Sequence, residues 1–155
     1  MRVLSDELDR LMVVMQAAFD PAYGEAWTRR QVEDALIMGS SHYRIFDEAG
    51  EIAGPDAAVA AFTLSRNTGE EEELLLFAVS PEFRRRGIGR RMLHVLNDDA
   101  RNRGALRIFL EMRRGNTAES LYRTFGFSPI GVRPKYYRFS NGERADAITF
   151  AIDID

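Results

Sequence analysis

The stretch AVSPEFRRRGIGRRML, residues 78–93, places three arginines and two glycines between an apolar run and an amphipathic segment. The apolar run, Leu74–Val79, is typical of a buried strand. The segment after the glycines repeats apolar residues at helical spacing and stops at Gly104, which predicts a helix over about 87–103. The stretch therefore predicts a strand, a turn and a helix N-terminus in direct succession.

A turn of this kind can bind an anion. The first backbone N–H groups of a helix have no partner within it, and they favour negative charge. Gly87 and Gly89 remove Cβ atoms where a phosphate would touch the backbone, and the neighbouring arginines supply positive charge. A pyrophosphate fits this arrangement. Motifs for ATP and NAD fit poorly, because no Lys-Ser/Thr pair follows the glycines and Met92 stands where the dinucleotide fingerprint needs a small residue.

Two other interpretations of the turn stay open on the residues alone. A solvated arginine turn would use the glycine pair only for its geometry. A nucleic-acid patch is less favoured, because the basic residues occupy one turn of an acidic chain and lack interleaved aromatic residues for stacking.

The rest of the chain predicts an α+β fold. A first helix is expected over about 5–19 with Ser5 as N-cap, a second over about 28–38 with a capping box at Thr28, and a short one over 117–125. Strands are expected at about 42–48, 57–65, 72–79, 106–112, 127–138 and 146–153. Because the long helix joins the third and fourth strands, these two should be parallel. The expected architecture is a mixed, mostly antiparallel sheet with a central parallel pair and helices on both faces.

Composition limits the function further. A chain of 155 residues fits one domain, 1–155, and its net charge of −3 gives no global field that would attract nucleic acid or an anionic membrane. Without cysteine, and with only the separated His42 and His94, neither a thiolate nucleophile nor a metal site is expected. The acidic N-terminus is unlike a signal peptide, and no apolar run approaches the roughly 20 residues that span a bilayer. The cytoplasm is the expected compartment.

The quoted stretch resembles the acetyl-CoA-binding motif of the GNAT N-acetyltransferases, Gln/Arg-x-x-Gly-x-Gly/Ala between a strand and a helix. Arg84, Gly87 and Gly89 carry the match. The stretches FLEMRRGNTAESLYRTFGF, 109–127, and RPKYYRFSNGERADAITF, 133–150, are further similar to the bacterial ribosomal-protein N-terminal acetyltransferases within that family. The resemblance implies a GNAT fold and acetyl-CoA as co-substrate.

The resemblance also implies which residues hold acetyl-CoA. Backbone N–H groups of the turn would bind the pyrophosphate, and the preceding strand would pair with the pantetheine. The cofactor-binding residues expected on this basis are Phe77, Ala78, Val79, Arg84, Arg85, Arg86, Gly87, Ile88, Gly89, Arg90 and Asn116. Between Asn116 and the tyrosine that follows it, this chain has one residue fewer than the subgroup usually has, so Asn116 is shifted by one position.

Two side chains are candidates for proton transfer. Glu111 alternates with apolar residues on a strand next to the cofactor strand, where a carboxylate facing a cleft can act as a base, and the alternative is a solvent-facing glutamate. Tyr122 lies on the short helix, where a phenol can protonate the departing thiolate, and the alternative is a core tyrosine. The resemblance favours the role of base for Glu111 and the role of acid for Tyr122. The resemblance also implies that a backbone N–H near Val79 polarises the thioester carbonyl.

Further residues are expected on the acceptor side. Tyr136 and Tyr137 resemble residues that hold the acceptor peptide, with hairpin packing as the alternative, and Asp146 is expected to fix that hairpin. Trp27 lies in GEAWT, a segment loosely similar to the family's Pro-Trp-Ser/Thr. The acidic run Glu70–Glu73 is interpreted as a solvated strand start.

The resulting function is an acetyl-CoA-dependent N-acetyltransferase whose acceptor is a primary amine, first of all the α-amine of a protein N-terminus. The alternatives are an acetyltransferase for a small-molecule amine and a non-catalytic acyl-CoA-binding module. The chain is expected to act as a monomer or a homodimer.

Overall fold

The structure is a computed structural model that describes residues 2–154. Its helices are α1 (Arg2–Ala18), α2 (Arg29–Ile37), α3 (Ile88–Asn102) and α4 (Glu119–Phe125). Its strands are β1 (Ser41–Phe46), β2 (Ala61–Asn67), β3 (Glu71–Val79), β4 (Arg107–Arg113), β5 (Ser128–Arg138) and β6 (Arg144–Asp153). Within the described residues, no helix is long and apolar enough to cross a membrane.

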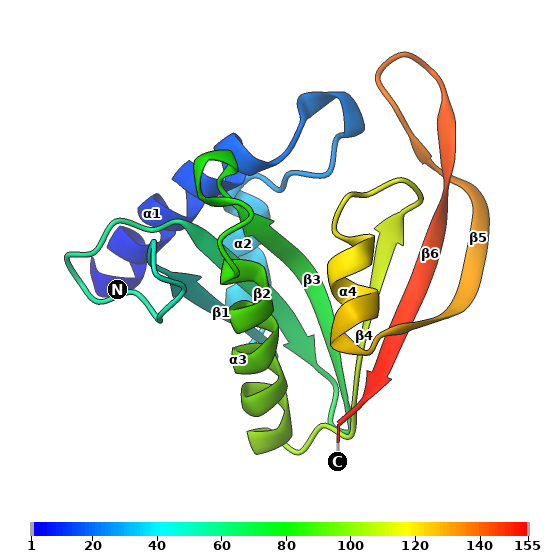
Figure 1. The fold of residues 1–155 in the computed structure, drawn as a ribbon. Coiled ribbons are helices and arrows are strands. Elements are labelled where there is room, and N and C mark those ends of the chain that lie inside the picture. The colour runs from blue at the N-terminus through cyan, green and yellow to red at the C-terminus, as the bar shows by residue number, and fades with distance from the viewer. Residues whose placement is uncertain (1, 155) are drawn as a thin grey trace.

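The strands form one open sheet in the order β1-β2-β3-β4-β6-β5 (Figure 1). Only β3 and β4 are parallel to each other, and every other neighbouring pair is antiparallel. The predicted mixed sheet with a central parallel pair is therefore confirmed, and α3 is the crossover that makes this pair possible.

Helices cover both faces of the sheet, as predicted. On one face α1 and α2 pack on the first three strands, and the buried residues there include Leu11, Val14 and Met15 of α1. On the other face α3 and α4 pack over the centre, where Leu93, Leu96 and the residues of β4 with even numbers form the core. The alternating burial along β4 follows from the two-residue period of a strand.

The helix starts confirm one predicted cap and correct another. Thr28 caps α2 through a capping box with Gln31, in which each side chain accepts a hydrogen bond from the other residue's backbone N–H. The predicted N-cap at Ser5 is wrong, because α1 already begins at Arg2. The residues before Ser5 include good helix formers, and their helical backbone continues through the serine.

An irregularity in β3 positions the site. The pairing of β2 with β3 passes from Leu64 opposite Leu76 to Ser65 opposite Leu74, so Leu75 is an extra residue that forms a bulge. The parallel pairing of β3 with β4 covers only Glu71–Leu74 opposite Arg107–Leu110. Beyond that point the two strands diverge, as Figure 1 shows toward its upper side.

The acidic run at the start of β3 is only partly solvated, which corrects the sequence-based interpretation. The side chain of Glu72 is 0% exposed, and its carboxylate accepts hydrogen bonds from the side chains of Arg103, Ser65 and Asn67. Burial alone would raise the pKa of this carboxyl, but the hydrogen bonds and the charge of Arg103 lower it below its ordinary value. Glu72 thus ties the C-terminal end of α3 to the sheet.

Candidate functional site

The space between the diverging strands is a cleft of about 320 Å³. Its floor comes from β3 and β4, and its walls come from the segment between α1 and α2, from α4 and from β5. The lining residues are Phe19, Gly24, Glu25, Ala26, Trp27, Gln31, Leu74, Leu75, Leu76, Phe77, Leu110, Glu111, Met112, Asn116, Tyr122 and Tyr137. Both predicted proton-transfer residues are among them.

Glu111 faces the cleft from β4. Its neighbours Leu110 and Met112 are buried under α3 and α4, so strand alternation directs Glu111 to the opposite side of the sheet. There its Oε2 lies 3.1 Å from Nε of Arg133 on β5. The carboxylate is therefore held by an ion pair and remains accessible from the cleft.

Tyr122 reaches the cleft from α4 and is only 5% exposed. Its ring packs edge-on against Phe77 and Phe127, with centroid distances of 5.6 and 5.7 Å. Burial, and after it the negative charge of Glu25, raises the pKa of the Tyr122 phenol well above its ordinary value. Tyr122 belongs to the core and also lines the cleft, so the two interpretations of this tyrosine are compatible.

Glu25 is a cleft residue that the sequence analysis missed. It lies between the short 3₁₀ turn Pro21–Tyr23 and α2, and its Oε2 is 3.6 Å from Nε of Arg113. Burial raises the pKa of the Glu25 carboxyl, and Arg113 opposes this shift. The segment has no periodicity that would reveal which side chains face the cleft. The one available indication was an acidic residue two positions before Trp27.

The residues predicted on the acceptor side divide into two groups. Trp27 and Tyr137 line the cleft, and burial, followed by the charge of Glu111, raises the pKa of Tyr137 to about 12. Tyr136 is 51% exposed and does not line the cleft. It packs edge-on against Tyr137 and lies under the guanidinium of Arg133, so for Tyr136 the structure favours hairpin packing.

The β5–β6 hairpin meets the segment between α1 and α2 above the cleft. The N–H of Ser140 donates to the carbonyl of Ala22 at 3.1 Å, and the rings of Tyr23 and Phe139 pack edge-on at 4.9 Å. Asp146 fixes the hairpin by accepting hydrogen bonds from the N–H of Lys135 and from Nε of Arg114. We call the contact of residues 22–23 with 139–140 the arch. It joins two segments that each contribute residues to the lining of the cleft, Gly24 and Glu25 from one and Tyr137 from the other.

The glycine-arginine turn lies at the N-terminus of α3. Gly87 is its N-cap with φ of 82°, and no side chain caps the helix there. A Cβ on Gly87 would have nothing within 4 Å. The backbone of Arg85 is also left-handed, with φ of 64°, a strained conformation for a residue with a side chain. Within the described residues, no acceptor lies within hydrogen-bonding distance of the N–H groups of residues 85–90. The turn thus has the features of an anion cradle.

The side chains of the turn have different surroundings. Arg84 is exposed but held against the backbone, because its guanidinium donates to the carbonyls of Val79 at 3.0 Å and Ala18 at 2.8 Å. The guanidinium of Arg86 lies over the ring of Phe83. Ile88 is buried in the core. The Arg85 and Arg90 side chains form no hydrogen bond, ion pair or ring contact with the described residues. They are therefore available to a ligand.

The remaining cofactor-binding candidates lie along β3 and before α4. Phe77, Ala78 and Val79 belong to the part of β3 that has left β4, so this stretch has no strand partner on its β4 side. Asn116 lines the cleft, but its Oδ1 accepts a hydrogen bond from the N–H of Ala118, which builds the turn into α4. Asn116 therefore has a structural role at the rim of the cleft.

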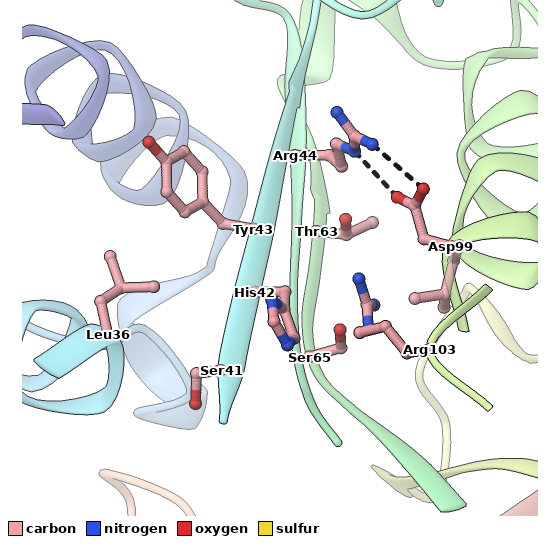
Figure 2. A pocket seen from close by; sticks show the side chains of 10 residues that line it. Leu36, Ser41, His42, Tyr43, Arg44, Thr63, Ser65, Asp99 and Arg103 are labelled. Carbon is pink, nitrogen blue, oxygen red and sulfur yellow. Dashed lines mark hydrogen bonds and ion pairs between the residues drawn. The ribbon is translucent and has the colours of Figure 1, made fainter. Parts of the chain in front are cut away.

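A second hollow, of about 280 Å³, lies around β1 near the end of α3 (Figure 2). Its charged side chains pair with one another or with their neighbours: Arg44 makes two hydrogen bonds to Asp99, and Arg103 binds the buried Glu72. Because its charges are already neutralised and it is remote from the turn, it is a weaker candidate than the cleft.

Residues 39–129 match the family described as Acetyltransferase (GNAT) domain, which is more than half of the chain. The chain belongs to the GNAT acetyltransferase family. The resemblance expected from the glycine-arginine turn is thereby confirmed, as are the predicted enzyme class, an N-acetyltransferase, and acetyl-CoA as its co-substrate.

Several GNAT relatives have assigned activities. The N-alpha-acetyltransferase RimI of Mycobacterium tuberculosis is 43% identical over 130 residues, which is 83% of this chain and 77% of that protein. The ribosomal protein bS18-alanine N-acetyltransferase of Salmonella typhimurium is 38% identical over 100 residues, or 64% of this chain and 67% of that protein. The match to the ribosomal protein bS18-alanine N-acetyltransferase of Escherichia coli covers 65% of that protein, just under two thirds of its length.

Solved structures support the same fold. The crystal structure of the ribosomal-protein-S18-alanine N-acetyltransferase from Escherichia coli has a TM-score of 0.79 and 27% identity, covering 96% of this chain and 88% of that one. An aminoglycoside 6'-N-acetyltransferase complexed with coenzyme A has a TM-score of 0.73 at 17% identity, a likeness of fold alone. The predicted GNAT fold is confirmed.

Proposed function

We propose that this GNAT enzyme transfers the acetyl group of acetyl-CoA to the α-amine at the N-terminus of a protein. The observation that carries the proposal is the cleft at the divergence of β3 and β4, which is lined by both Glu111 and Tyr122. The names of the relatives from Mycobacterium tuberculosis and Salmonella typhimurium point to the same class of acceptor.

The described residues fit acetyl-CoA in two places. The free N–H groups of residues 85–90 and the exposed Arg85 and Arg90 would hold the pyrophosphate. The unpaired edge of β3 at residues 77–79 would hold the pantetheine as an added strand does. Bound there, acetyl-CoA supplies a thioester whose acyl group lies in the cleft.

The protein's own groups then move protons. An α-amine and a thiol have ordinary pKa values of about 8 and 8.5, so the proton transfers need little driving force and positioning does most of the work. Glu111, held by Arg133, accepts a proton from the amine nitrogen. The Tyr122 phenol, kept neutral by burial, donates its proton to the leaving sulfur.

The arch favours the end of a chain as the acceptor. The hydrogen bond from Ser140 to Ala22 ties the β5–β6 hairpin to the segment that carries Glu25, so an extended peptide cannot pass between the two without breaking this contact. A chain terminus can enter from the open side and present its amine to Glu111. The same opening would admit a small amine, and a peptide panel with blocked and unblocked N-termini separates the two kinds of acceptor.

The test is acetylation of a peptide panel followed by mass spectrometry. We expect acetylation of peptides with a free N-terminus and none of the same peptides with a blocked N-terminus, even where they contain lysine. Glu111→Gln should reduce kcat by about 100-fold while acetyl-CoA binding persists. Acetylation of polyamines or aminoglycosides alone would replace the proposal by a small-molecule acetyltransferase. Tight coenzyme A binding without turnover of any amine would indicate a binding module.

A further inference from the structure

The cleft contains two carboxylates on different walls. Glu111 projects from β4, whereas Glu25 comes from the segment between α1 and α2. The charge of Glu25 acts on the phenols of both Tyr122 and Tyr137, whereas that of Glu111 acts on Tyr137. Glu25 is therefore the cleft carboxylate whose charge is felt at the proposed acid.

The surroundings hold Glu25 in place without neutralising it fully. Its partner Arg113 lies at 3.6 Å, beyond hydrogen-bonding distance. The guanidinium of Arg113 is fixed by stacking on the ring of Tyr23 at 3.7 Å, and it also lies 6.0 Å from the ring of Phe139 in the arch. Glu25 is thus tied, through Arg113, to the arch residues Tyr23 and Phe139.

The reaction removes two protons from the acceptor nitrogen, and Glu111 can hold only one of them at a time. An α-amine is mostly an ammonium ion near neutral pH and must lose one proton before it can attack and another as the amide forms. Neither histidine helps: His42 lines the hollow around β1, and His94 packs on Phe125. The ionisable groups that line the cleft are Glu25, Glu111, Tyr122 and Tyr137, with Arg113 beside Glu25 and Arg133 beside Glu111. Of these, only the two glutamates can accept a proton at neutral pH.

We propose that Glu25 binds the ammonium group of the acceptor and accepts its first proton, so that a neutral amine is delivered to the thioester. The inference rests on the proposed function. An N–H bond breaks, its electron pair stays on nitrogen, and an O–H bond forms on Glu25. Glu111 takes the second proton as the amide forms. Overall two protons leave the nitrogen, one ends on the sulfur by way of Tyr122, and one is released to water.

Burial supports this role, because it raises the pKa of the Glu25 carboxyl toward that of the ammonium and so makes the carboxylate a stronger base. The ion pair with Arg113 keeps Glu25 ionised before the acceptor arrives. Arg113 is accordingly a positioning residue for Glu25.

The test is the pH dependence of kcat/KM for an unblocked peptide, measured for the wild type and for Glu25→Gln. We expect the variant to lose about tenfold or more at pH 7, with a raised KM for the peptide, and to recover above pH 8, where the free amine predominates. The KM for acetyl-CoA should not change. Glu25→Asp, which keeps a carboxylate, should restore part of the activity at pH 7, and the exposed Glu48→Gln serves as a matched control for loss of one charge.

The outcomes separate the two proposals. If the wild type acetylates peptides and Glu25→Gln keeps both the pH profile and the peptide KM of the wild type, the role of Glu25 is refuted and the proposed function stands. If Glu25→Gln is reduced equally at every pH, as is expected for Glu111→Gln, Glu25 does not handle the ammonium proton. A wild type that acetylates no free peptide N-terminus overturns the proposed function and the inference with it.

Discussion

Gly89 on α3 lies so close to Leu121 on α4 that a Cβ built on the glycine would be 2.8 Å from Leu121 Cδ2. The ring of Phe77 would be 3.4 Å from the same atom. A Cβ on the second glycine of the turn would therefore require the end of the Leu121 side chain to shift, and α4 carries Tyr122 one residue after Leu121. The geometry of the anion cradle and the position of the proposed acid are linked through this contact.

Gly89→Ala should lower both stability and turnover. Overpacking costs about 1–3 kcal/mol, partly offset by a gain of up to about 1 kcal/mol in helix propensity. We expect a net loss of about 1 kcal/mol in urea denaturation and a lower kcat, because the end of the Leu121 side chain must shift next to Tyr122. Gly54→Ala is the matched control, since its Cβ would meet nothing within 4 Å. A Gly89→Ala protein with wild-type kcat would show that α4 is not positioned by this contact.

The buried Glu72 should make stability depend on acid pH. Its pKa is lowered in the folded protein, so its stabilising contribution is present above the ordinary glutamate pKa of about 4.3 and is lost as the pH falls through the folded value. Glu72→Ala leaves Arg103 without its partner and should cost about 3–5 kcal/mol at pH 7. The difference in unfolding free energy between wild type and variant should shrink as the pH is lowered below 4. A difference independent of pH would contradict the ion pair.

The sequence predicts the central unit of this fold well. A strand-like apolar run, an amphipathic segment ending at glycine and a second alternating strand leave one economical arrangement, because a long helix between two strands of one sheet requires a parallel pair. The family resemblance singled out Glu111 and Tyr122, which both line the cleft, and the capping box at Thr28 was predicted to the residue.

The missed features depend on contacts between distant parts of the chain. Glu72 and its partner Arg103 are separated by 31 positions, and no local pattern distinguishes Glu72 from the solvated acids beside it. Glu25 lies in an irregular segment, where orientation follows from tertiary packing alone. The sequence does not reveal the bulge at Leu75 either, because the apolar run around this residue is uninterrupted.

The arginines of the turn should separate into structural and ligand-binding ones. Arg84→Ala removes hydrogen bonds to the carbonyls of Val79 and Ala18, so we expect a loss of stability of about 1–3 kcal/mol. Arg90→Ala should leave the melting temperature unchanged and weaken coenzyme A binding several-fold, by an amount that diminishes at high salt. Calorimetric titration at two salt concentrations measures this. Equal binding losses and equal melting temperatures in the two variants would refute the division.

Removing the hydroxyl of Tyr122 should affect turnover and leave stability intact. The phenol makes no hydrogen bond with the described residues, and its ring is held by Phe77 and Phe127, contacts that phenylalanine preserves. Tyr122→Phe should therefore unfold within about 0.5 kcal/mol of the wild type. Without a proton for the leaving sulfur, kcat should fall about 100-fold or more while the KM for acetyl-CoA is retained. Steady-state kinetics with urea denaturation on the same preparation tests both parts. A stable variant with wild-type kcat would remove Tyr122 from the mechanism, because thiolate departure would then need no acid from α4.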